Sequence, residues 1–135
     1  MAIATGFLST PIRVETVNLS GTLDLAFDDG LRFRFTVTNT GDEPIELQFR
    51  DGQSVEFVVL ENGTECWRWS DGRLFTQAIR SERLAPEKPA IYESEWPTSE
   101  SGRYTARATL CAENCDCSAE RIIELSGETL SSNPS

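Results

Sequence analysis

The four cysteines are the side chains of this sequence with the widest range of covalent and metal chemistry. Cys111, Cys115 and Cys117 follow the spacing C-x3-C-x-C, and Cys66 stands apart. Four thiolates suit a tetrahedral Zn²⁺ ion, although the usual zinc knuckle is C-x2-C. By strand period, Cys66 and Cys111 fall opposite the expected core faces. Three states stay open: free thiols, a zinc site built from these four residues, and one or two disulfides.

The absence of histidine limits the other chemistry that the chain can perform. It excludes a Ser-His-Asp or Cys-His catalytic set and any His metal ligand. It also removes the usual general base near neutral pH and the usual activator of a cysteine nucleophile. The sequence shows no Gly-rich phosphate loop, Rossmann fingerprint or nucleophile elbow. We predict that the protein is not an enzyme and has no cofactor other than the zinc considered above.

Adjacent carboxylates occur at Asp28-Asp29 and at Asp42-Glu43. Such pairs can bind Ca²⁺, but nothing here matches an EF-hand loop. Adjacent acids arise often in so acidic a chain, and we interpret both pairs as solvated turns.

Residues 64–77 hold the densest aromatic pattern. Trp67 and Trp69 are two positions apart and therefore share one face of a strand. A turn follows, because Asp and Gly favour turns. The candidate partner-binding residues are the aromatic anchors and this turn: Trp67, Trp69, Ser70, Asp71, Gly72, Arg73, Phe75 and Gln77.

Two interpretations of this group stay open. Aromatic side chains most often fill a core, where each buries roughly 150–250 Å². Alternatively, the aromatic residues anchor residues 70–74 as a binding loop at one end of the domain, where binding surfaces usually lie. Residues 97–100 form an equal contender, and the sequence does not choose between the two loops.

The charge balance is strongly acidic, with 22 acidic against 12 basic residues and a net charge of −10. This charge opposes binding to nucleic acid or an anionic membrane. Lys88 is the only lysine. We hypothesise adaptation to high intracellular salt, because at about 1 M ionic strength the Debye length is roughly 3 Å and carboxylates repel one another little.

The length of 135 residues fits a single domain. No apolar run is long enough to span a membrane, and residues 1–11 lack the basic region of a signal peptide. We expect a cytoplasmic protein, monomeric, with an N-terminal extension at 1–11, a domain at 12–126 and a flexible C-terminal tail at 127–135.

Alternating apolar and polar residues recur along the chain, separated by turn signals. Asp-Gly at 29–30 and Asn-Gly at 62–63 predict hairpins. Residues 72–88 are less regular. The pattern predicts an all-β fold, an Ig-like antiparallel β-sandwich of about eight strands. The expected strands cover residues 22–27, 31–37, 45–49, 55–59, 66–70, 90–96, 104–110 and 121–125.

Residues 100–106 sharpen this prediction. Glu-Ser-Gly-Arg-Tyr-Thr-Ala is similar to the Asp-x-Gly-x-Tyr-x-Cys element of immunoglobulin domains. This similarity places Tyr104 at a tyrosine corner, where its hydroxyl group would bond back to the backbone.

Several short motifs follow one another in a fixed order. They are Val-Thr-Asn at 37–39, Phe-Arg-Asp-Gly-Gln at 49–53, Trp-Arg-Trp-Ser at 67–70, Phe-Thr-Gln at 75–77, Leu-Ala-Pro-Glu at 84–87, Trp96, and Ser-Gly-Arg-Tyr at 101–104. Together, over roughly residues 12–111, they resemble the BsuPI family of intracellular proteinase inhibitors. The Gly of the family's Leu-x-Pro-Gly-Glu turn is missing here.

The resemblance implies an inhibitor of an intracellular subtilisin-like serine proteinase. Combined with the Trp-rich strand, it suggests that residues 70–74 block the substrate cleft. Two alternatives stay open, because fold does not imply function. One is an Ig-like protein-interaction module with another partner, and the other is a small zinc-binding protein.

Overall fold

The computed structural model describes residues 18–98 and 100–125, so the predicted extension at 1–11 and tail at 127–135 lie outside the described part. Nine strands form in the described residues. They are β1 (Leu19–Phe27), β2 (Leu31–Asn39), β3 (Ile45–Phe49), β4 (Val55–Glu61), β5 (Thr64–Arg68), β6 (Arg80–Leu84), β7 (Ala90–Trp96), β8 (Gly102–Leu110) and β9 (Ser118–Leu125).

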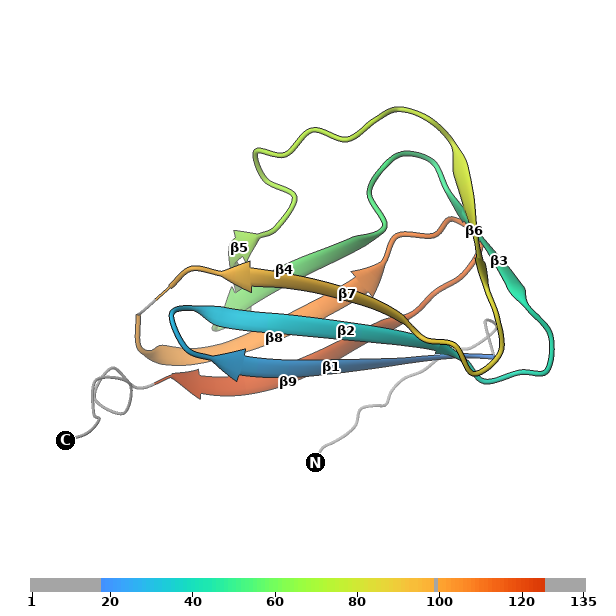
Figure 1. The fold of residues 1–135 in the computed structure, drawn as a ribbon. Helices are drawn as coiled ribbons and strands as arrows, with labels where there is room; N and C mark the ends of the chain where they lie inside the picture. The colour runs from blue at the N-terminus through green and yellow to red at the C-terminus, as the bar shows by residue number, and fades with distance from the viewer. Residues whose placement is uncertain (1–17, 99, 126–135) are drawn as a thin grey trace.

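Two antiparallel sheets form a sandwich. One sheet has the strand order β1-β2-β7 and the other β5-β4-β8-β9, while β3 and β6 pair separately. Figure 1 shows the two layers, with β1, β2 and β7 lying over β9, β8 and β4, and the β3–β6 pair at one end. The predicted all-β, Ig-like sandwich is confirmed. In the residues that the structure describes, no helix is long and apolar enough to cross a membrane.

The core lies between the layers and follows the alternation of the sequence. In β2 the residues at odd positions from 31 to 37 are buried, whereas Arg32 and Arg34 are exposed. Strands β4 and β8 contribute the opposite wall, including Phe57, Val59 and Ala106, each at most 1% exposed. Apolar burial of this kind is the main favourable term in folding.

Turns form in the structure where short sequence motifs predicted them. Asn62 and Gly63 have φ values of 55° and 81°, as a two-residue hairpin between β4 and β5 requires. The Tyr104 hydroxyl group donates to the carbonyl oxygen of Ser101 at 3.2 Å and lies 3.4 Å from that of Glu100. The tyrosine corner is therefore confirmed.

The sequence predicted about eight strands, whereas the described residues form nine, and the additional strand is β6. Its sequence, Arg-Ser-Glu-Arg-Leu, has a single buried residue, Leu84. Apolar alternation therefore could not reveal it. The strand forms because it pairs with β3, from Ile45 opposite Leu84 to Phe49 opposite Arg80.

Asn39 at the end of β2 is the one buried polar residue among those described, with 1% of its surface exposed. Its amide nitrogen donates to the carbonyl oxygens of Glu43 at 2.8 Å and Leu84 at 2.9 Å, and its amide oxygen accepts from the Gly41 N–H at 2.9 Å. Burial of the amide is tolerated because it makes three hydrogen bonds. Asn39 thereby ties β2 to β6 and to the turn before β3.

Candidate functional site

Residues 69–79, called here the 69–79 segment, connect β5 to β6 and contain most of the predicted partner-binding residues. The segment arches above β4 and β7 in Figure 1. The predicted end loop at 70–74 is thus the first part of a longer connection between two strands of different sheets. Residues 74–79 carry no charge, and Leu74 and Ile79 are 99% and 81% exposed.

The segment begins with a hydrogen-bonded turn that ends β5 at Arg68. The Asp71 N–H donates to the Arg68 carbonyl oxygen at 3.1 Å, and the Arg73 N–H donates to that of Ser70 at 3.0 Å. Gly72 has a φ of 80°, a value that type II turns require at their third position. The chain therefore reverses at Ser70 to Arg73, as the sequence predicted.

The aromatic residues form a row of contacts through the core. The ring centroids are 6.2 Å apart for Trp96–Trp67, 5.7 Å for Trp67–Phe33, 5.3 Å for Phe33–Phe57, 6.4 Å for Phe57–Trp69 and 5.7 Å for Trp69–Phe75. Both Trp67 and Trp69 are partly buried against the core cluster. Trp67 contacts the core residue Phe33 and also Trp96, as the core interpretation expects. Trp69 contacts the core through Phe57, and it also contacts Phe75 of the 69–79 segment.

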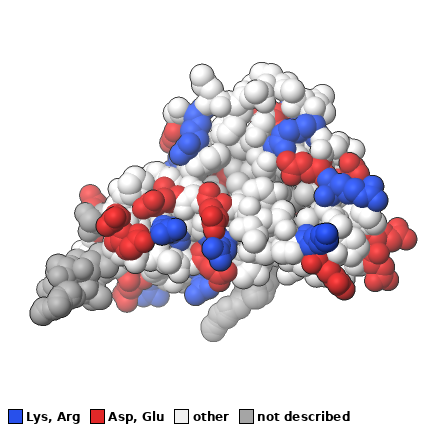
Figure 2. Space-filling view, in the orientation of Figure 1, with Lys and Arg blue, Asp and Glu red and all other residues white. Residues whose placement is uncertain are grey.

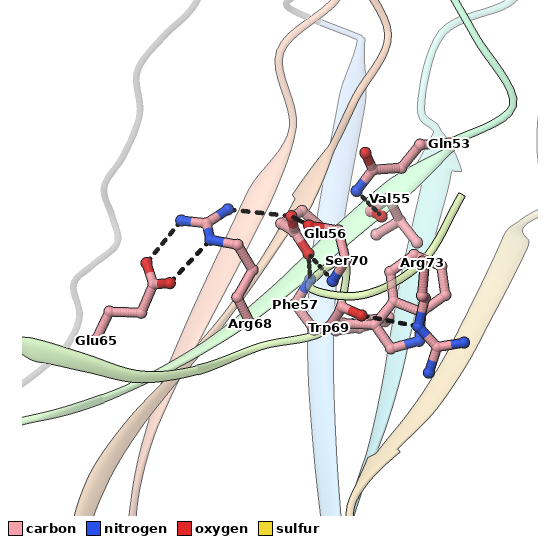
Figure 3. A network of polar contacts seen from close by, with 9 residues as sticks. All are labelled: Gln53, Val55, Glu56, Phe57, Glu65, Arg68, Trp69, Ser70 and Arg73. Carbon is pink, nitrogen blue, oxygen red and sulfur yellow. Dashed lines mark hydrogen bonds and ion pairs between the residues drawn. The ribbon is translucent and has the colours of Figure 1, made fainter. Parts of the chain in front are cut away.

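Arg73 and Phe75 both pack on Trp69. The guanidinium carbon of Arg73 lies 4.4 Å from the centroid of the indole ring, and the Arg73 Nε donates to the Trp69 carbonyl oxygen at 2.8 Å. A cation over an indole face is attracted by the ring quadrupole. Figure 3 shows Arg73 against Trp69. Further along, the Thr76 carbonyl oxygen accepts from the Gly52 N–H at 2.9 Å.

Glu56 of β4 holds the start of the segment through Ser70 and Arg68 (Figure 3). Its side chain is 13% exposed and accepts from the Ser70 hydroxyl group at 2.5 Å, the Ser70 N–H at 3.2 Å and Arg68 Nη1 at 3.0 Å. Arg68 also binds Glu65 at 2.7 Å. The Glu65 and Glu56 carboxylates raise the pKa of Arg68, and Arg68 lowers the pKa of Glu65.

Two predicted elements lie outside this arrangement. Gln77 is exposed, and its side-chain nitrogen lies 3.4 Å from the Phe75 carbonyl oxygen, at the limit of a hydrogen bond. The competing loop at 97–100 includes residue 99, which is outside the described residues. There the Thr98 N–H donates to the Trp96 carbonyl oxygen at 2.8 Å.

The four cysteines are free thiols in different surroundings. Cys66 is exposed, as expected from its position opposite the tryptophans, and Cys115 is buried. Cys111 is partly buried against the core, contrary to expectation, because β8 ends at Leu110 and strand alternation stops there. Burial raises the pKa of Cys115, of Cys111 to about 11 and of Cys117 to about 12, whereas at the exposed Cys66 partial desolvation and the nearby Glu61 carboxylate raise the pKa.

Metal-binding side chains do not gather in the described residues. Within 18–98 and 100–125, no group of three or more His, Cys, Asp or Glu is placed to hold a metal ion. Asp28 at the β1–β2 turn instead binds Arg32 at 3.1 Å. The zinc alternative stays a prediction, which elemental analysis of protein purified under reducing conditions would test.

Sequence reasoning missed Glu56 and did not single out Leu74 or Ile79. The partners of Glu56 depend on the register that places Val58 opposite Arg68, which a single strand pattern does not reveal. The exposure of Leu74 and Ile79 depends on the path of an irregular segment. The available signal was an apolar residue directly after the Asp-Gly-Arg turn.

A scan of protein families matches residues 19–115 to a family described as BsuPI, intracellular proteinase inhibitor. No curated protein sequence matches the chain.

The solved structures to which this chain is similar are distant in sequence. The CARDB domain of a Pyrococcus furiosus protein is 17% identical, with a TM-score of 0.47, and the match covers 82% of this chain and 96% of that domain. The sporulation control protein Spo0M of Bacillus subtilis is 11% identical, with a TM-score of 0.49, covering 82% of this chain and 50% of Spo0M.

Proposed function

This chain belongs to the BsuPI family of intracellular proteinase inhibitors, and we propose that it inhibits a subtilisin-like serine protease by placing residues 70–74 in the substrate cleft. The observation that carries this proposal is the anchoring of Arg73 and Phe75 on Trp69 while Leu74 between them is exposed. A protruding segment held at defined points can enter a protease cleft without first being ordered.

Rigidity matters because binding costs conformational entropy. Each rotamer-rich side chain that becomes ordered on association costs about 0.5–1.5 kcal/mol. The Glu56 and Trp69 contacts supply part of this order before the partner arrives. Ser70 is held by two hydrogen bonds to Glu56, and Gly72 allows the turn itself.

A role as a binding protein and not as an enzyme agrees with the side chains available. The sequence has no histidine, and the pKa of each cysteine is raised above its usual value, which keeps the thiols protonated and weakly nucleophilic near neutral pH. The proposal includes a cytoplasmic location, a monomeric state and a protein partner, with no nucleic acid or membrane partner. The family name and the acidic charge support these statements.

An inhibition titration in molar KCl tests the proposal, with the subtilisin-like protease at a fixed concentration and this protein added in steps. Stoichiometric loss of protease activity is expected. A variant with Asp71 to Arg73 replaced by Gly and Ser residues should inhibit much more weakly. A matched variant with residues 97–100 replaced in the same way should inhibit like the wild-type protein.

If the variant at residues 97–100 inhibits weakly and the variant at Asp71 to Arg73 inhibits like the wild-type protein, the loop at 97–100 is the inhibitory one. Full protease activity at a large excess of the folded wild-type protein would contradict the inhibitor function for that enzyme. Isolation of a stable partner that is not a protease would then favour the interaction-module alternative.

A further inference from the structure

Leu74 is the most exposed of the large apolar side chains that the structure describes, with 99% of its surface accessible. An apolar side chain left entirely in water contributes no burial to folding, whereas burial in a partner is favourable. Single exposed apolar residues are common, so exposure alone has no functional meaning. The contacts of the neighbouring residues distinguish Leu74.

The residues on both sides of Leu74 are fixed to one indole ring. Arg73 contacts Trp69 through the guanidinium group at 4.4 Å and through the hydrogen bond of 2.8 Å to its carbonyl oxygen. Phe75 packs on the same indole at 5.7 Å. One residue later, the Thr76 carbonyl oxygen is held by Gly52. The backbone at Leu74 is therefore fixed from both sides, while its side chain is free.

The surroundings of Leu74 favour an apolar pocket. Residues 74–79 contain no charged side chain. In the orientation shared by Figures 1 and 2, the uppermost surface is mainly uncharged, with charged side chains of both signs at its left end and over much of the region below. The Leu74 side chain itself would gain nothing from a pocket with a charge at its base, whereas its burial against apolar walls is favourable.

We propose that Leu74 is the primary specificity residue of the inhibitor, and that its side chain fills the S1 pocket of a serine protease whose S1 pocket is apolar. The S1 pocket is the subsite that selects the side chain before the scissile bond in a serine protease. This inference rests on the proposed function and adds to it the residue that enters the pocket and the class of protease that accepts it.

Ile79 provides an internal control. It lies on the same segment and is 81% exposed, but its neighbour Ala78 is exposed as well. Arg80 on its other side is fixed, with Nε donating to the Asp51 carbonyl oxygen at 2.9 Å. Ile79 is thus an equally apolar side chain that is not held between two anchored neighbours.

The test compares wild-type protein, Leu74→Lys and Ile79→Lys against two purified proteases. Subtilisin represents the proposed target class, whose S1 pocket the proposal takes to be apolar, and trypsin offers an S1 pocket with an Asp at its base. Leu74→Lys should bind subtilisin about 100-fold or more weakly, because a charge would enter an apolar pocket. The same variant should gain inhibition of trypsin. Ile79→Lys should retain subtilisin inhibition within about threefold. Thermal unfolding should show all three proteins folded, because neither side chain is buried.

The possible failures are distinct. If the wild-type protein inhibits subtilisin and Leu74→Lys inhibits it equally well, the specificity role is wrong and the proposed function stands. If Ile79→Lys loses as much inhibition as Leu74→Lys, the segment binds as a general apolar surface and the role is again wrong. If a large excess of the folded wild-type protein leaves subtilisin fully active, the proposed function is contradicted for that enzyme and this inference is overturned with it.

Discussion

Replacing Glu56 tests whether one carboxylate holds the start of the 69–79 segment. The side chain is 13% exposed and accepts two hydrogen bonds from Ser70 and one from Arg68. Hydrogen bonds to charged groups contribute roughly 1.5–3 kcal/mol each, but water can reach the partly exposed donors and offset part of the loss. We expect Glu56→Ala to lower the free energy of unfolding by about 2–3 kcal/mol.

Urea unfolding followed by tryptophan fluorescence measures this loss. Glu65→Ala is the matched control, because Glu65 also pairs with Arg68 but solvent screens the interaction. Glu65→Ala should therefore cost much less. A double-mutant cycle between Glu56→Ala and Ser70→Ala separates the hydrogen bonds from other effects, and the expected coupling energy is about 1–2 kcal/mol.

Glu56→Ala should also weaken inhibition of the protease. If the start of the segment is freed, it must be ordered when the protease binds, at about 0.5–1.5 kcal/mol per side chain, which weakens inhibition roughly 3–10-fold. Equal losses of stability for Glu56→Ala and Glu65→Ala, or a coupling energy near zero with Ser70, would refute the reasoning.

Other perturbations probe the scaffold. Asn39→Ala should lower the free energy of unfolding by about 2–4 kcal/mol in urea, because buried backbone groups lose their partner; a loss below about 1 kcal/mol would contradict this. A Cβ atom at Gly102 would lie 2.9 Å from the Tyr104 hydroxyl oxygen, so Gly102→Ala should cost about 1–3 kcal/mol in the same assay. Burial raises the pKa of Cys111 to about 11 and of Cys117 to about 12, from 9.0. Because these thiols ionise at a lower pH in the unfolded chain than in the folded protein, the free energy of unfolding is highest below about pH 9. It falls as the pH rises toward the pKa values of the folded protein. A Tm that stays constant between about pH 8 and about pH 11 would contradict this prediction. The net charge of −10 predicts a higher Tm in molar KCl than in low-salt buffer, and an unchanged Tm would remove the argument for salt adaptation.

The parts of the fold that could be predicted are those encoded locally. The alternation in β2, the Asn62-Gly63 hairpin and the tyrosine corner at Tyr104 all depend on residues within one strand or turn. Strand β6 could not be predicted, because its residues become a strand only through pairing with β3, which ends about thirty residues earlier.

In the candidate site, too, some features could be predicted from the sequence and others could not. The turn at Ser70 to Arg73 and the common face of the tryptophans follow from residue type and strand period. The role of Glu56 depends on the register between β4 and β5, and the exposure of Leu74 depends on where its neighbours are held. The partners of Glu56 arise from contacts between distant parts of the chain and have no local signal. For Leu74 the one local signal is an apolar residue directly after the Asp-Gly-Arg turn.

The strand pairings also set the order in which the molecule can assemble. Val55 pairs with Leu110 and Phe35 with Tyr92, so the central contacts join residues far apart in the chain, and topologies of this kind fold slowly, in about milliseconds to seconds. The two ends of the 69–79 segment belong to different pairs, β5 with β4 and β6 with β3. The segment acquires its final path only after both pairs have formed. If the 69–79 segment is the binding element, as proposed, a newly made chain becomes competent to bind only after both pairs have formed.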